Sequence, residues 1–68
     1  MKTKKTFTIE LTWKDESSKY FKVEVEGTTH EIESILMWIT RGTLMATYAI
    51  KAICYNDEGF DVMSYTQY

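Results

Sequence analysis

The chain has 68 residues, of which 44% are hydrophobic and 15% aromatic, and its formal net charge is −2. This composition is too apolar for a disordered chain, and no apolar run approaches the ~20 residues that a membrane-spanning helix needs. With a sequence pI of about 5.2, the chain has no bulk electrostatic attraction to nucleic-acid phosphates or anionic lipid.

The cysteine and histidine counts restrict how so small a domain can be stabilised. A chain of this size hides only about 60% of the surface that its unfolded form exposes. Cys54 is the single cysteine and His30 the single histidine, so neither a disulfide within the chain nor a Cys/His zinc cluster can form. Self-association is the remaining way to add stability to so small a domain. We expect a single domain over 1–68, with a frayed N-terminus over 1–5. The lone thiol and the lack of a signal-peptide pattern predict a cytoplasmic protein.

Two alternating segments open the chain. Residues 6–13 alternate between apolar and polar side chains, and residues 20–26 do the same after the short polar stretch 14–18. This period of two, rich in threonine and aromatic residues, predicts two strands. Because the connection is too short for a parallel crossover, the strands are expected to form an antiparallel hairpin.

Residues 28–42 carry the signals of one helix. Thr28 with Glu31 three residues later fits a capping box, although Thr29 is a near competitor for the cap. Gly42 supplies a left-handed stop, and Arg41 would lie in the last turn. One apolar flank follows the helical spacing and leaves Met37 pointing elsewhere. Its members are Ile32, Ile35, Leu36 and Ile39.

Residues 43–55 are ambiguous between helix and strand. We interpret them as a strand, because residues 56–59 (Asn-Asp-Glu-Gly) suit a hairpin turn with a bulge and residues 60–68 then alternate weakly. The predicted fold class is α+β with the order ββαββ. Two antiparallel β-hairpins flank one α-helix, which packs on a mainly antiparallel four-stranded sheet. The strand order stays open.

The turn type sets a register for the last hairpin, in which Tyr55 pairs with Asp61, Cys54 with Val62 and Lys51 with Tyr65. One predicted face then lies under the helix and holds Leu44, Ala46, Tyr48, Ile50, Ala52, Cys54, Phe60 and Val62. The opposite face holds Met45, Ala49, Ile53, Tyr55, Met63 and Tyr65.

A single helix covers only one face of a sheet, so this opposite face is expected to be bare. Methionine and tyrosine are enriched at protein interfaces, and soluble monomers rarely leave such patches uncovered. We therefore predict a non-catalytic protein-interaction module that forms a homodimer or binds a protein partner. The candidate contact residues are Met37, Trp38, Met45, Ile53, Tyr55, Met63 and Tyr65.

Three alternatives stay open for this patch. In the first, its members are ordinary strand residues that neighbouring side chains partly cover. In the second, the patch is the surface through which a small inhibitor or accessory protein binds a larger enzyme. In the third alternative, Tyr55 and Tyr65 with Lys51 form a platform for single-stranded nucleic acid. The acidic net charge and the nearby Asp61 argue against nucleic acid.

No catalytic, metal or cofactor motif is present in the sequence. His30 lies in an exposed first helical turn, and Cys54 is flanked by Ile53 and Tyr55 with no base beside it. The acidic residues of the last turn do not have the spacing of an EF-hand loop. We expect no enzymatic activity and no cofactor.

Overall fold

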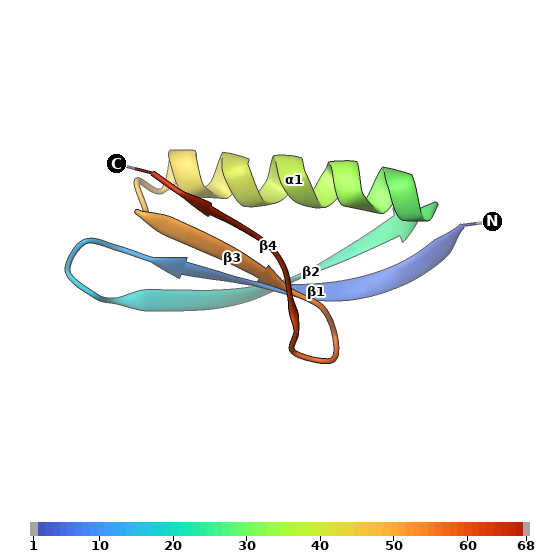
Figure 1. Cartoon of the computed structure of the whole chain (residues 1–68), viewed down its shortest axis with the longest axis horizontal. Coiled ribbons are helices and arrows are strands. Elements are labelled where there is room, and N and C mark those ends of the chain that lie inside the picture. Colours follow the sequence, from blue (N-terminus) through green and yellow to red (C-terminus); the bar gives the residue numbers. More distant parts are fainter. Residues whose placement is uncertain (1, 68) are drawn as a thin grey trace.

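The structure is a computed structural model that describes residues 2–67. It contains strands β1 (Thr3–Thr12) and β2 (Ser18–Gly27), helix α1 (Thr29–Ala46), and strands β3 (Lys51–Tyr55) and β4 (Asp61–Thr66). The four strands form one sheet in the order β2-β1-β3-β4, and every neighbouring pair is antiparallel. The helix lies along one face of this sheet (Figure 1). The predicted ββαββ fold of the α+β class is confirmed.

The first hairpin forms as predicted but is longer. Strand β1 begins at Thr3, which pairs with Gly27, and the ladder continues without interruption to the pair Thr12 and Ser18. Residues 3–5, which we expected to be frayed, are therefore part of the sheet. Their strand partners are available because β2 extends to Gly27.

The start of helix α1 agrees with the sequence signals. The Thr28 side chain accepts a hydrogen bond from the Glu31 N–H at 3.2 Å, and the Glu31 carboxylate accepts one from the Thr28 N–H at 2.8 Å. This is a complete capping box, so Thr28 rather than Thr29 is the N-cap.

The end of helix α1 differs from the expectation. Gly42 lies inside the helix, which continues for one more turn to Ala46 with Thr47 as the C-cap residue. The buried side chain of Leu44 continues the core-facing stripe, and burial there outweighs the low helix propensity of one glycine. Arg41 is therefore not in the last turn. Tyr48, with φ of 58°, adopts the left-handed conformation after the helix instead of Gly42.

The core lies between the helix and the face of the sheet that it covers. Ile9 and Cys54 are completely buried there. Thr40 is a buried polar residue whose Oγ1 has no hydrogen-bond partner of good geometry among the described residues. The apolar core consists of Phe7, Ile9, Leu11, Val25, Ile32, Leu36, Leu44, Ala49, Ala52 and Cys54.

The register predicted for the last hairpin is correct at its turn and wrong beyond it. Tyr55 pairs with Asp61, but a β-bulge follows, so that Cys54 faces Met63 and Ala52 faces Tyr65. The turn is held by Asn56, whose Oδ1 accepts hydrogen bonds from the N–H groups of Glu58 and Phe60 at 3.0 Å. A one-residue shift moves every later side chain of a strand to the other face of the sheet.

Candidate protein-interaction surfaces

The predicted contact patch is not one surface, because the bulge and the longer helix divide its residues. Met63 and Tyr65 lie on the helix side of the sheet and pack against the core, and the Tyr65 ring centroid is 5.8 Å from the guanidinium carbon of Arg41. Ile53 and Tyr55 lie on the uncovered face, where they were predicted. The remaining three, Met37, Trp38 and Met45, lie on helix α1, and Met45 was expected in a strand.

The uncovered face of the sheet is organised around Glu10. Its Oε1 accepts a hydrogen bond from the Tyr55 hydroxyl at 2.8 Å, and its Oε2 accepts one from the Tyr20 hydroxyl at 2.9 Å. Ile53 is the strand partner of Glu10 on β3. The centre of this face is thus a carboxylate between two tyrosines, which differs from the apolar patch predicted from the sequence.

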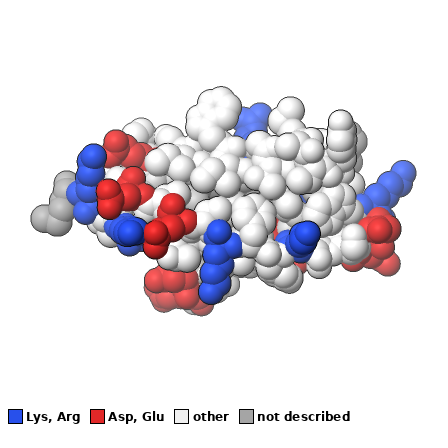
Figure 2. Space-filling model, turned by 180° about the vertical axis from the view of Figure 1, so that it is seen from behind, with Lys and Arg blue, Asp and Glu red and all other residues white. Residues whose placement is uncertain are grey.

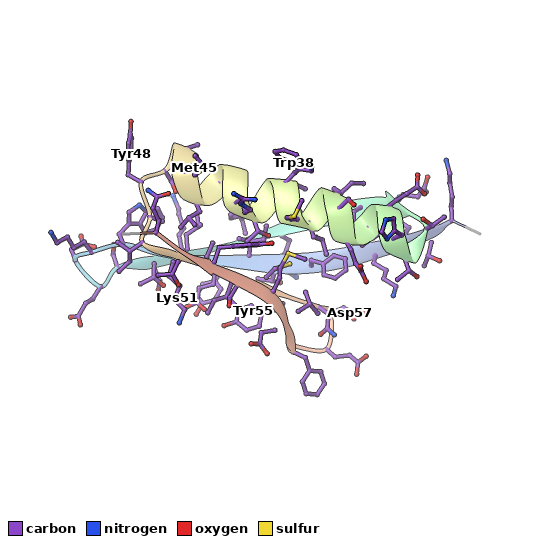
Figure 3. The ribbon with its side chains drawn as sticks, turned by 45° about the horizontal axis from the view of Figure 1, so that its top comes forward. Trp38, Met45, Tyr48, Lys51, Tyr55 and Asp57 are labelled. Carbon is purple, nitrogen blue, oxygen red and sulfur yellow. The ribbon has the colours of Figure 1, made fainter. Side chains whose placement is uncertain are left out.

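The bond to Glu10 also changes the acid–base behaviour of both tyrosines. The hydrogen bond to the carboxylate, and the negative charge behind it, raise the pKa of Tyr20 and Tyr55 above the ordinary value of 10.0. Tyr55 and the turn after it border a shallow hollow of about 630 Å³ on this face, which Lys22 also lines. The labelled Tyr55 and Asp57 lie on this side of the ribbon (Figure 3).

A second hollow, of about 480 Å³, lies beside the first half of the helix. It exists because β3 pairs with β1 only over Thr8–Thr12, so the second hairpin diverges from β1 beyond Tyr55. Met37 lines this groove together with Val62. Met37 is therefore half-buried at the edge of the core, separate from the exposed residues on the back of the helix.

The largest exposed apolar side chains on the helix side form a stripe that we call the outward stripe: Trp38, Met45 and Tyr48. Their side chains are 71%, 62% and 83% exposed. Trp38 and Met45 are seven residues apart, which places them on the same side of a helix, and Tyr48 follows directly after its end. All three point away from the sheet (Figure 3).

The edge of the molecule at β2 carries a further apolar region. Phe21 and Val23 of β2 and Ile35 and Ile39 of α1 are half-buried side chains that pack against the core from this edge. Strand β2 is the rear edge in Figure 1, so the view from behind in Figure 2 shows this side. The upper and middle part of this side is mostly uncharged, and the charged side chains gather in its lower part and at its two ends.

The titratable residues form no recognisable catalytic arrangement in the described part of the chain. Burial raises the pKa of the Cys54 thiol, and the neighbouring Thr40 hydroxyl lowers it to a lesser degree. A buried, protonated thiol is a poor nucleophile. Within residues 2–67, no three His, Cys, Asp or Glu side chains lie close enough to hold one metal ion.

The helix of the described chain is too polar to span a bilayer. Comparison of the sequence and the structure with protein families, with curated proteins and with solved structures gives no match.

Proposed function

We propose that this protein is a small, non-catalytic protein-interaction module that docks on a partner protein through the outward stripe. The observation that carries the proposal is the exposure of Trp38, Met45 and Tyr48 on one side of the molecule. Tryptophan, tyrosine and methionine are enriched at protein interfaces, and tryptophan and tyrosine supply much of the binding energy there.

The backbone beside the stripe supports the same proposal. Tyr48 has a positive φ of 58°, a conformation that costs a bulky residue about 1 kcal/mol or more. Despite this cost its ring is directed into solvent and is the most exposed of the large hydrophobic side chains. A partner with an apolar groove would cover the ring together with Trp38 and Met45.

The geometry of the sheet weighs against nucleic acid as the partner. Tyr65, one of the two tyrosines of the predicted stacking platform, lies on the helix side. The hydroxyls of Tyr20 and Tyr55 are bound to the Glu10 carboxylate, whose negative charge repels phosphate. An inhibitor or accessory protein of a larger enzyme remains one form of the proposed interaction module.

Site-specific photo-crosslinking in the cells that naturally produce the protein tests this proposal. A benzophenone amino acid replaces Trp38, and in a matched control it replaces Phe60, which is 66% exposed but lies in the β3–β4 turn. We expect a discrete adduct from position 38 that Met45→Glu abolishes, and none from position 60. No adduct from position 38, or the same adducts from both positions, would contradict the proposal.

A further inference from the structure

Within residues 2–67, strand β2 is a long sheet edge without a strand partner on its outer side. It has ten residues, all paired with β1 on the inner side. The opposite edge, β4, has only six residues and is interrupted by the bulge at its start. Because a regular edge presents free N–H and C=O groups that favour pairing with another strand, β2 is the better template for association.

The hydrogen-bond pattern identifies the groups that face outward. The Trp13 N–H donates to the Ser17 carbonyl at 2.9 Å, so residues 13 and 17 are a hydrogen-bonded pair. Bonded and non-bonded pairs alternate along an antiparallel ladder. The residues of β2 whose backbone groups point away from β1 are consequently the even-numbered ones, which include Tyr20, Lys22, Glu24 and Glu26.

We propose that two copies of this chain associate through their β2 strands, paired antiparallel about a two-fold axis at Val23. In this register Lys22 of each protomer lies opposite Glu24 of the other, and their outward backbone groups bond to each other. The two sheets then become one continuous sheet of eight strands. This interface is independent of the outward stripe on which the proposed function rests.

The side chains on both faces of β2 fit this register. On the uncovered face, two Lys22–Glu24 pairs bring opposite charges directly together, beside the ion pair of 3.3 Å that Glu24 makes with Lys4 within each chain. On the helix face, Val23 meets Val23 of the partner subunit and Phe21 meets Val25 of the partner subunit. Phe21 and Val23 are half-buried in one chain, and the pairing would cover them further.

Other registers that keep the two helices on the same face of the sheet are less favourable. A shift of two residues in one direction places Lys22 opposite its own copy, and a shift in the other direction places Glu24 opposite its own copy. Like charges directly opposite each other destabilise a strand pair. The register centred on Val23 is therefore selected by charge as well as by the backbone.

Sedimentation velocity on two charge-reversal variants and on their mixture tests the pairing. Lys22→Glu and Glu24→Lys each replace two attractive pairs by two repulsive ones, so each variant alone should dimerise about tenfold more weakly than the wild type. In a 1:1 mixture the introduced glutamate at position 22 faces the introduced lysine at position 24, and heterodimers should form with near wild-type affinity. The inference would be overturned if the wild type were monomeric at several hundred micromolar. It would also be overturned if the mixture dimerised no more strongly than either variant alone.

An engineered disulfide tests the register directly. Residues opposite each other in a non-bonded antiparallel pair have Cα atoms about 4.5 Å apart, which is within the range of a disulfide. Val23→Cys should therefore oxidise to a covalent dimer. Glu26→Cys on the same strand should not, because its own copy would lie about 20 Å away. Wild type is the background control, since Cys54 is buried. Failure of Val23→Cys to crosslink would overturn the register. It would leave the proposed function untouched, because that proposal is tested separately by photo-crosslinking from position 38.

Discussion

The indole Nε1 of Trp13 donates a hydrogen bond to the carbonyl oxygen of Thr47 at 2.8 Å. This bond joins the residue after β1 to the C-cap residue of α1, although the two are 34 positions apart in the sequence. The last carbonyls of a helix have no partner within the helix. Trp13 provides one of these partners and so helps the helix to continue past Gly42.

Replacement of Trp13 by phenylalanine should therefore destabilise the fold. A smaller aromatic ring takes the place of the indole, and the Thr47 carbonyl loses a donor in a partly buried position, which should cost about 1 kcal/mol of unfolding free energy. Urea unfolding followed by circular dichroism measures the difference. Trp38→Phe is the matched control and should change stability by less than about 0.5 kcal/mol, because Trp38 is on the surface. Equal effects of the two substitutions would contradict this role of Trp13.

Gly42 and Gly59 should respond oppositely to alanine. A Cβ added at Gly42 would meet no atom within 4 Å, and the residue is helical, so Gly42→Ala should stabilise the protein by about 1 kcal/mol. Gly59 has φ of 89°, where a side chain is strained, so Gly59→Ala should destabilise it by about 1 kcal/mol. Thermal unfolding of both variants provides the comparison. If Gly42 were the helix stop that its sequence position suggests, Gly42→Ala would instead be destabilising.

The capping box should make the stability of the fold depend on pH in the acidic range. The hydrogen bond from the Thr28 N–H lowers the pKa of Glu31 below its ordinary value of 4.5. A carboxyl with a lower pKa in the folded state stabilises the fold above its unfolded pKa, and this contribution is lost as the pH falls through the folded value. The melting temperature of the wild type should therefore fall more between about pH 5 and pH 3 than that of Glu31→Gln. Glu33→Gln leaves the cap intact and should behave like the wild type in this range.

The Glu10 cluster should be visible in an ultraviolet titration of the tyrosines. Because the bond to Glu10 raises the pKa of Tyr20 and Tyr55, Glu10→Gln should lower both toward 10.0. A tyrosine whose pKa is higher in the folded state stabilises the fold below its unfolded pKa, and this contribution is lost as the pH rises through the folded value. The wild type should thus lose more stability above about pH 10 than the variant. Glu58→Gln in the β3–β4 turn is the control, and an unchanged tyrosine titration in Glu10→Gln would refute the assignment.

Local signals in the sequence were sufficient for the first hairpin and for the start of the helix. The strands follow from an alternation of period two, and the cap is formed by Thr28 and Glu31, which are only three residues apart. Such features are stabilised by neighbours in the chain, so a single sequence contains all the residues involved. The order ββαββ follows from them together with the turn at residues 56–59.

The tertiary structure decided the end of the helix, the register of the last hairpin and the positions of the candidate contact residues. Leu44 and Trp13 extend the helix through contacts that no local pattern contains, and this extension brings Met45 onto the outward stripe. The bulge places Met63 and Tyr65 against the core, because the helix side of the sheet is where their apolar surface is buried. The exposure of β2 as an edge likewise depends on β3 pairing with β1, a contact between residues about 40 to 50 positions apart, which local chain chemistry does not determine.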